Sequence, residues 1–277
     1  MSLLSKLSPV EPLPHGKITW RSGGGIALFT LTNPPANGYS YEMMQDLDQA
    51  ILRARMDQEV HVIVLAGEGE KFFCAGADIG MLRSVTPHFK YNFCLHANET
   101  LMRLEHTPKL VIAALGGHCV GGGLEVALAA DLRIARAGSG KTGLPEVNLG
   151  VLPGTGGTQR LARVLGKSRS IEMMATGKLI RYEQAAEWGL VNQLIEAEDD
   201  ASFLDHVLEY ATTFCPPGRA SMAVGHIKRA VHSGLEVPLE SGLALERELQ
   251  AKLFLSDDSK EGIAAFLEKR EAVFTGR

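Results

Sequence analysis

The sequence predicts an α/β protein in which strands and helices alternate over the first two thirds and helices fill the remainder. Three observations carry this prediction. Short apolar, β-branched runs recur along the chain, stretches with helical spacing stand between them, and the last third shows mainly amphipathic helical patterns. We therefore expect a core over residues 1–200 and a helical region over residues 201–277, without a low-complexity linker between them.

The N-terminal part begins with a predicted hairpin. Residues 17–32 give two strands around a run of three glycines, and the hairpin is closed by Asn33-Pro34-Pro35. Ser40 is suited to cap the helix that follows, because apolar residues then recur at helical spacing. The run at 60–67 is apolar throughout, which is typical of a strand covered on both faces.

A second group of elements surrounds two glycine clusters. We expect a helical region near 84–106, a strand at 110–115, a short buried helix at 124–130 and a strand at 131–135. Glycines and a proline then predict a loop, and from residue 155 the pattern gives helices and one strand, at 190–196. Asp258 with Glu261 resembles a capping box for a helix over 260–270.

Composition excludes several function classes. The formal net charge is -4 and the basic residues are scattered, so we expect no nucleic-acid partner. No apolar run approaches the about 18 residues of a membrane span, and the N-terminus lacks a signal-peptide pattern, so we expect a soluble, cytoplasmic protein without a membrane partner.

Cysteines and histidines indicate neither disulfides nor a metal site. The cysteines stand at wide intervals without a Cys-x-x-Cys pair, and the histidines show no His-Glu-x-x-His pattern. We expect reduced thiols and no protein-bound metal. The four cysteines are Cys74, Cys94, Cys119 and Cys215.

The run Gly121-Gly122-Gly123 opens the short helix that contains Glu125. Backbone N–H groups at a helix start lack intrahelical partners and lie at the positive end of the dipole, which suits an anion or oxyanion. The glycines could instead serve only close packing of the helix on a sheet. Glu125 favours a functional role, because an ionisable carboxyl inside an apolar helix is costly unless it is paired or used.

Glu146 supplies a second acid in an apolar loop, directly after Leu144-Pro145. Two carboxyls in partly apolar surroundings can adopt different protonation states, one acting as base and the other as acid. The alternative is that Glu146 caps a helix or meets an arginine. Residues 135–142 loosely match a phosphate loop, but the glycines and prolines that follow forbid the long helix such a loop opens. The run 154–157 we interpret as a helix entrance.

Several motifs together resemble the crotonase superfamily, in particular its enoyl-CoA hydratase branch. They are CAGADI (74–79), VGGGLEVALAADLRIA (120–135), GLPEVNLGVLPGTGGTQRLARVLG (143–166) and KEGIAAFLEKREAVF (260–274). The resemblance implies a spiral of ββα units with a helical C-terminal region used in trimerisation, in a homotrimer or homohexamer. It also implies an acyl-CoA thioester as substrate, with coenzyme A as part of that substrate and no separate cofactor.

The resemblance assigns roles to particular residues. It implies an oxyanion hole from the N–H groups of Ala77 and Gly122, and catalytic roles for Glu125 and Glu146, which bind and activate water. Glu146 would supply the proton to the α carbon. The further substrate-binding residues that it implies are Ala75, Asp78, Ile79, Gly121, Pro145 and, reaching a neighbouring subunit, Phe266 and Lys269.

The predicted reaction is hydration of a 2-enoyl-CoA to a 3-hydroxyacyl-CoA. Retention of both glutamates favours it over an enoyl-CoA isomerase, which can work with one, and over a non-catalytic binding protein on the same scaffold. One position departs from the family: Gly80 stands where a lysine often meets the coenzyme A phosphates. His118, just before the glycine cluster, we interpret as packed or solvent-facing.

Overall fold

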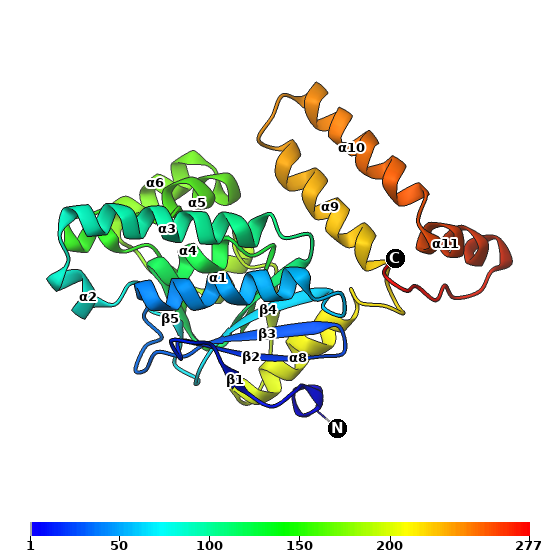
Figure 1. Cartoon of the computed structure of the whole chain (residues 1–277). Coiled ribbons are helices and arrows are strands. Elements are labelled where there is room, and N and C mark those ends of the chain that lie inside the picture. The colour runs from blue at the N-terminus through cyan, green and yellow to red at the C-terminus, as the bar shows by residue number, and fades with distance from the viewer. Residues whose placement is uncertain (1) are drawn as a thin grey trace.

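The computed structural model describes residues 2–277, apart from the side chain of Ile79, and its body is built on two sheets (Figure 1). In the larger sheet the strand order is β1-β2-β3-β4-β6-β8-β11. Strands β3 to β11 of this order run parallel, and β1 and β2 are antiparallel to their neighbours. The bounds are β1 Glu11–Pro12, β2 Ile18–Gly23, β3 Ile26–Leu31, β4 Val62–Gly67, β6 Leu110–Leu115, β8 Leu132–Arg136 and β11 Gln193–Ile195.

A smaller sheet has the order β10-β9-β7-β5, with β5, β7 and β9 parallel. Its strands are β5 Phe72–Cys74, β7 His118–Val120, β9 Lys141–Gly143 and β10 Ile180–Arg181. The chain repeatedly gives one strand to the larger sheet, the next to the smaller sheet, and then a helix. Thus β4 and β5 precede α2 (Ile79–Ser84) and α3 (Pro87–Glu105), and β6 and β7 precede α4 (Gly122–Leu128). The predicted spiral of ββα units is confirmed.

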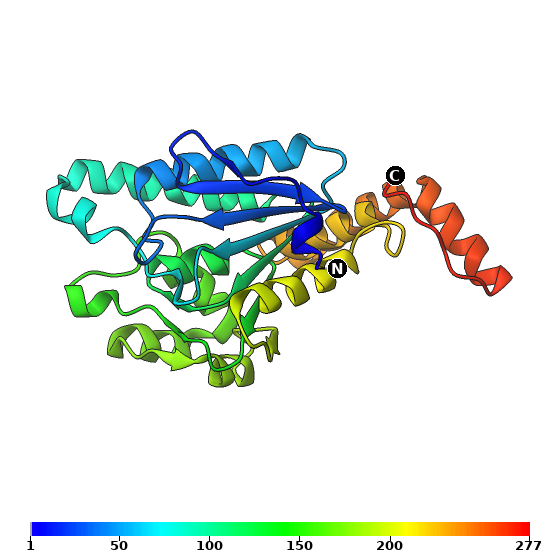
Figure 2. The same cartoon turned by 90° about the horizontal axis from the view of Figure 1, so that it is seen from below.

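The larger sheet is buried on both faces because its central strands are apolar throughout. In β4, Ile63 and Leu65 join the core formed with α1 (Tyr41–Met56) and α3, whereas Val62 and Val64 join the core formed with α8 (Asp200–Thr212). Figure 2 shows the sheet between these two layers of helix. Since α8 packs on the sheet, the body continues past residue 200, and the division at that residue stays a prediction.

The remaining helices cover the side of the smaller sheet and form the C-terminal arm. They are α5 Gly157–Leu165, α6 Lys167–Thr176, α7 Tyr182–Glu187, α9 Ser221–Gly234, α10 Leu239–Phe254 and α11 Asp257–Glu268. Helices α9 to α11 extend away from the body (Figure 1). Within residues 2–277, no helix combines the length and apolar character that crossing a bilayer requires.

The helix caps give one confirmed prediction and one correction. The Ser40 side chain accepts a hydrogen bond from the Met43 N–H and caps α1, as predicted. The capping box at Asp258 is wrong, because Ser256 caps α11. Asp258 lies inside that helix and is buried, and its carboxylate accepts N–H groups from Thr275 and Gly276, a pairing distant in sequence that no local motif predicts.

Five short strands lie where the sequence predicted no strand: β1, β5 and β10, together with β7 between the glycine clusters and β9 in the following loop. Because Lys141 begins a strand, no helix follows the phosphate-loop-like run, in agreement with the prediction. The Lys141 N–H donates to His118 Nδ1 at 3.0 Å, which ties β7 and β9 together. His118 therefore has a structural contact of its own.

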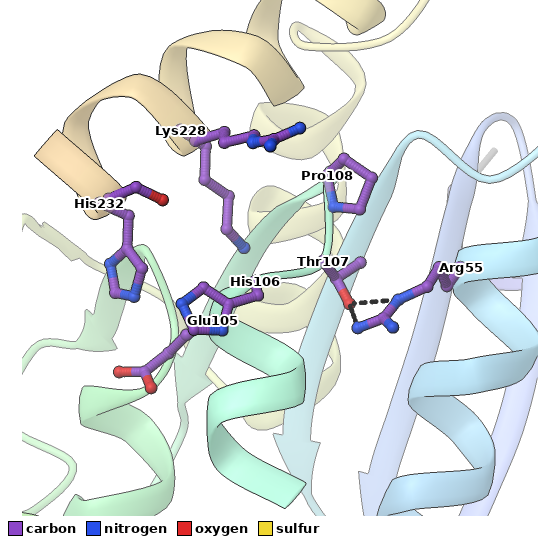
Figure 3. A pocket seen from close by; sticks show the side chains of 9 residues that line it. Arg55, Glu105, His106, Thr107, Pro108, Lys228 and His232 are labelled. Carbon is purple, nitrogen blue, oxygen red and sulfur yellow. Dashed lines mark hydrogen bonds between the residues drawn. The ribbon is translucent and has the colours of Figure 1, made fainter. Parts of the chain in front are cut away.

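A buried ion pair fastens α9 to the body. Lys228 Nζ lies 2.8 Å from Asp131 Oδ2 and donates to the carbonyl oxygens of Leu104 and Lys109 at 3.3 and 3.0 Å. The Lys228 side chain is 4% exposed. It borders a cavity of about 430 Å³ between α9 and the ends of α1 and α3 (Figure 3). The Lys228 ammonium, with one carboxylate and two carbonyl oxygens as partners, thus fixes α9 to the body.

We predict that Lys228→Met destabilises the protein by about 3 kcal/mol, because Asp131 would remain buried without its counter-ion. Urea unfolding measures this change. The matched control is Lys260→Met, which removes a lysine paired with Asp257 on the exposed face of α11 and should cost less than about 0.5 kcal/mol. Equal losses in the two variants would contradict the role given to the buried pair.

Candidate active site

The candidate site lies at one edge of the smaller sheet. Strands β5, β7 and β9 are parallel, so their carboxyl ends meet at the same edge. The segments that follow these strands contain Ala77, Gly122 and Glu146, respectively. The topology therefore brings together three segments that are far apart in sequence.

Two backbone N–H groups at this edge are free. A Cβ placed on Gly76 would lie 3.1 Å from the Gly122 nitrogen, so the segment with Ala77 runs directly against the start of α4. In residues 2–277 neither the Ala77 nor the Gly122 N–H has a hydrogen-bond acceptor. Gly122 opens the helix, where an intrahelical partner is impossible. The pair can receive an oxyanion.

The glycines serve both close packing and N–H presentation. Gly121 has φ +58° and ψ −132°, a conformation that side chains with a Cβ rarely adopt. A Cβ on Gly122 would collide with the Tyr39 ring, and one on Gly123 would collide with the Cys74 carbonyl. The two interpretations of this cluster are therefore compatible, because close packing is what exposes the first N–H groups of α4.

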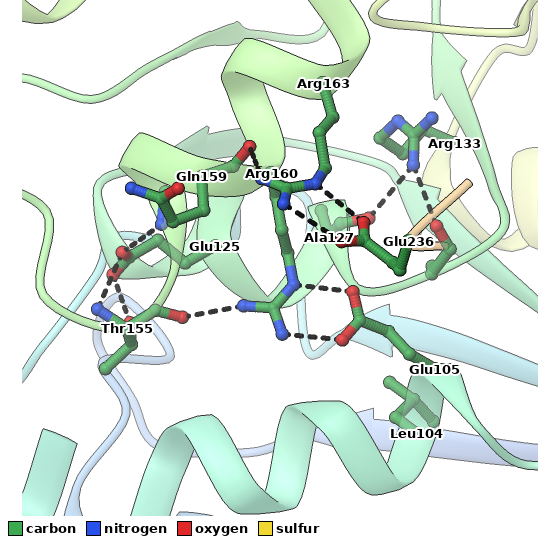
Figure 4. Close-up of polar contacts among 12 residues, drawn as sticks. Leu104, Glu105, Glu125, Ala127, Arg133, Thr155, Gln159, Arg160, Arg163 and Glu236 are labelled. Atoms are coloured by element: carbon green, nitrogen blue, oxygen red, sulfur yellow. Dashed lines mark hydrogen bonds and ion pairs between the residues drawn. The ribbon is translucent and has the colours of Figure 1, made fainter. Parts of the chain in front are cut away.

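Glu125 is 1% exposed, and its carboxylate accepts three hydrogen bonds from the loop before α5 and the first residue of that helix (Figure 4). Oε1 accepts the Thr155 N–H at 2.8 Å and the Gly157 N–H at 2.7 Å, and Oε2 accepts the Thr155 hydroxyl. A Cβ on Gly157 would lie 3.0 Å from Oε1. The acid is therefore buried and held by three donors, on the helix that Gly122 opens.

An ion pair anchors the loop that holds Glu125. Arg160 binds Glu105 through two hydrogen bonds of 2.6 Å, and its third nitrogen donates to the Thr155 carbonyl at 3.0 Å (Figure 4). Both side chains of the pair are 12% exposed. This bidentate contact fixes the loop to the end of α3 and so fixes the donors to Glu125.

Glu146 has a different environment. Its Oε1 lies 3.1 Å from the position of a Cβ on Gly121, and its Oε2 is shielded from solvent without a partner in residues 2–277. Burial, with a further contribution from the negative charge of Glu125, raises the pKa of Glu146 from 4.5 to about 7, against the opposing effects of its own N–H and Lys90. Within residues 2–277 Glu146 neither caps a helix nor pairs with an arginine, the two alternatives that the sequence left open.

Comparison with known proteins identifies the family. The sequence profile described as enoyl-CoA hydratase/isomerase matches residues 21–277. A probable enoyl-CoA hydratase of Bacillus subtilis is 38% identical over 91% of this chain and 95% of the relative. The chain belongs to the enoyl-CoA hydratase/isomerase family. The resemblance to the crotonase superfamily is confirmed.

Further family members support the assignment. The short-chain-enoyl-CoA hydratase of Clostridium acetobutylicum is 34% identical over 90% of this chain and 93% of that protein. An enoyl-CoA hydratase structure from Geobacillus kaustophilus has a TM-score of 0.90 and 45% identity, covering 94% of this chain and 97% of that one. One from Bacillus anthracis has a TM-score of 0.88 and 31% identity, covering 94% and 100%. The fold is therefore that of the family.

The other residues expected at the site fall into three groups. Ala75, Gly121 and Pro145 lie in the segments that converge at the sheet edge. Asp78 caps α2 by accepting the Met81 N–H at 2.8 Å, so its carboxylate has a structural partner. The side chain of Ile79 lies outside the described residues. The substrate contacts of all these residues stay predictions.

Phe266 and Lys269 are far from the two glutamates within one chain. Phe266 lies on α11 and is 83% exposed, and Lys269 ends that helix with φ +56°. Figure 1 shows α11 at the side of the molecule opposite α2. Their contact with the coenzyme of a neighbouring subunit, which the resemblance implied, stays a prediction.

Two side chains at the site were missed by sequence reasoning. Thr155 was interpreted only as part of a helix entrance, and Tyr39 was not considered. Both are buried, at 1% and 3% exposure. A signal did exist for Thr155, because a hydroxyl residue among glycines directly before a helix is a common position for binding an anion, whereas the position of Tyr39 depends on tertiary contact alone.

We predict that Glu146→Gln becomes increasingly stabilising as pH rises. In the wild type the folded state keeps a proton up to about pH 7 that the unfolded chain loses near 4.5, so wild-type stability falls as pH rises through this window. Because the carboxyl is only partly buried, we expect the difference between variant and wild type to grow by about 1 kcal/mol between about pH 5 and about pH 8. Urea unfolding at both values checks this, with Glu172→Gln, at an exposed glutamate, as the matched control. A difference that does not grow with pH would contradict the prediction.

Proposed function

We propose that this protein hydrates 2-enoyl-CoA thioesters to 3-hydroxyacyl-CoA products. The observation that carries the proposal is the pairing of two dissimilar carboxyls beside two free N–H groups. Glu125 accepts three hydrogen bonds, as suits a negative carboxylate, whereas the raised pKa of Glu146 allows it to carry a proton near neutral pH. A base, an acid and an oxyanion site are thus available together.

The thioester oxygen would accept hydrogen bonds from the Ala77 and Gly122 N–H groups. This withdraws electrons from the double bond and makes the β carbon electrophilic. A water held by Glu125 and Glu146 then attacks that carbon. Its oxygen forms the new C–O bond, and the π electrons move to the thioester oxygen as an enolate, which the N–H pair stabilises.

Protons balance within the pair. Glu125 takes one proton from the attacking water, and Glu146 gives one to the α carbon as the enolate collapses to the thioester. The pair is left with Glu125 protonated and Glu146 ionised, and exchange through solvent restores the starting state. The N–H pair supplies the polarisation that a Lewis acid would otherwise provide, so the proposal requires neither metal nor separate cofactor.

A second candidate is isomerisation of an enoyl-CoA, which moves a proton between the α and γ carbons and needs one mobile acid. The asymmetry of the site favours it to a degree, because Glu125 is already held by three donors while Glu146 Oε2 has none. Hydration remains the better proposal, since Glu125 keeps an unfilled lone-pair position on Oε2 with which to bind water.

We also propose a homotrimer or homohexamer in which α10 and α11 contact neighbouring subunits. These helices expose large apolar side chains that the body of the same chain does not cover, among them Phe254, Leu255, Phe266 and Leu267. Such a patch is typical of an interface. Phe266 and Lys269 would then contribute to the coenzyme site of another subunit, where Gly80 cannot supply a cation.

The remaining proposals concern location and partners. The cysteines are all free thiols, which suits a reducing compartment, and we propose the cytoplasm. The net charge of -4 and scattered basic residues support neither nucleic acid nor a membrane surface as partner.

We predict that the protein hydrates crotonyl-CoA and that Glu125→Gln and Glu146→Gln each lower kcat by about a hundred- to ten-thousand-fold, as expected for loss of a positioned acid or base. Loss of the conjugated thioester absorbance measures the reaction. A wild type that is inert on short, medium and aromatic-conjugated enoyl thioesters would refute the proposed hydration. Conversion of a 3-enoyl-CoA without hydration would establish the isomerase instead.

We predict a solution mass of three or six times the 29.9 kDa chain, measured by light scattering after size exclusion. Phe266→Asp should shift the protein to smaller species, because a charge at an apolar interface lacks a partner. The control, Met56→Asp, changes an exposed apolar residue at the end of α1 and should leave the mass unchanged. A monomeric wild type would refute the proposed assembly.

A further inference from the structure

Two buried hydroxyls, those of Tyr39 and Thr155, form a hydrogen-bonded chain that ends at the Glu125 carboxylate. The Tyr39 hydroxyl lies 3.1 Å from Thr155 Oγ1, and that hydroxyl contacts Glu125 Oε2. Both residues are buried, and the Tyr39 ring stacks on Phe93 with the centroids 5.6 Å apart. The chain therefore connects a fixed aromatic ring to the proposed base.

Counting donors gives the direction of the two hydrogen bonds. An ionised carboxylate only accepts, so the Thr155 hydroxyl must donate its single proton to Glu125. Thr155 Oγ1 is then left as an acceptor, and the Tyr39 hydroxyl must be the donor to it. Burial, and then the charge of Glu125, raises the pKa of Tyr39 well above its usual value, so this hydroxyl keeps its proton.

Counting lone pairs shows what the chain does to Glu125. A carboxylate offers about four acceptor positions, two on each oxygen. The Thr155 and Gly157 N–H groups fill both positions on Oε1, and the Thr155 hydroxyl fills one on Oε2. Within residues 2–277 nothing fills the second position on Oε2, and the Thr155 hydroxyl occupies the first.

Tyr39 also contacts both halves of the oxyanion hole. Its N–H donates to the Gly76 carbonyl at 2.9 Å and its carbonyl accepts the Asp78 N–H at 3.0 Å, so its backbone pairs with the segment around Ala77. Its ring occupies the space where a side chain on Gly122 would lie. A single residue thus touches both N–H segments and, through Thr155, the base.

We propose that Thr155 and Tyr39 are positioning residues that direct the one free lone pair of Glu125 toward the attacking water. They also hold the Glu125 carboxylate in a fixed position relative to the Ala77 and Gly122 N–H pair. Neither side chain needs to touch the substrate. The inference rests on the proposed hydration, to which it adds the source of the base's orientation.

Replacement of the hydroxyls tests the chain. Thr155→Val keeps the shape of the side chain and removes the donor, and we expect kcat to fall about ten- to a hundred-fold, with KM little changed. Thr155→Ser should restore most of the activity. The acid limb of the pH profile should move to higher pH in Thr155→Val, because the ionised base loses a donor, while the alkaline limb stays in place.

The second hydroxyl acts only through the first. Tyr39→Phe should lower kcat by about two- to ten-fold in the wild type and cause no further loss in the Thr155→Val background, because a residue without its partner has nothing left to orient. If the losses in kcat were additive in the double variant, the two hydroxyls would act independently and the proposed chain would be wrong.

Matched controls separate positioning from packing. Thr100→Val removes another buried threonine hydroxyl, one without a partner in residues 2–277, and Tyr182→Phe removes a buried tyrosine hydroxyl that donates to the Gly117 carbonyl. Both should leave the pH profile unmoved. The same shift of the acid limb in a control as in Thr155→Val would refute the specific role.

A measurement independent of turnover completes the test. With carbon-13 in the glutamate carboxyls, and the Glu125 signal assigned by its loss in Glu125→Gln, we expect this signal to move at fixed neutral pH in Thr155→Val and to stay in place in Thr100→Val, because only the first variant removes a donor to this carboxylate. An inert wild type would refute the proposed hydration, yet this signal would still move. An unmoved signal in an active enzyme would refute the positioning role alone.

Discussion

The burial of one negative carboxylate is the constraint on which the site depends. Glu125 is almost fully buried in a helix made otherwise of apolar residues and glycine, where a charge is costly unless donors surround it. The donors come from a loop thirty residues away in sequence, as the pairing of Glu125 with Thr155 shows. That loop in turn is fixed by Arg160 and Glu105. Helices α3, α4 and α5 are therefore held in one arrangement by the requirements of a single side chain.

The repeated ββα units explain how segments that are distant in sequence meet at one site. Each ββα unit adds one strand to the smaller sheet, and because these strands are parallel, the chain leaves each of them at the same edge. The segment after β5 contains Ala77, the segment after β7 contains Gly122 and Glu125, and the segment after β9 contains Glu146. Repetition of one structural unit thus delivers two N–H groups and two acids to one place without any local sequence connection among them.

The sequence could predict the parts of this arrangement that are local. Apolar runs identified the central strands, Ser40 identified the start of α1, and the glycines beside Glu125 identified a helix start suited to an oxyanion. Short strands such as β7 and β9 escaped, because three residues between glycines carry too little periodicity. Asp258 was misplaced for a related reason: its partners, Thr275 and Gly276, lie beyond the helix it was thought to cap.

The same limit applies to the site itself. Nothing near Tyr39 in sequence indicates that its hydroxyl meets Thr155, because the contact joins positions 116 residues apart. The apolar and glycine context, and then the resemblance to a family, indicated the two glutamates but not the two hydroxyls. Sequence reasoning can therefore indicate which acids are candidates, whereas the donors around each acid come together only in the fold.

The difference between the two glutamates follows from this distribution of donors. Both carboxyls lie at the same sheet edge, and the charge of Glu125 acts on Glu146, yet within residues 2–277 the protein places three donors on Glu125 and leaves Glu146 Oε2 with none. Hydrogen bonds stabilise the ionised form of the first, and burial stabilises the protonated form of the second. In the proposed reaction, further donors at Glu146 would favour ionisation of both acids, so the lack of a partner at Glu146 Oε2 within residues 2–277 matters as much as the three donors at Glu125.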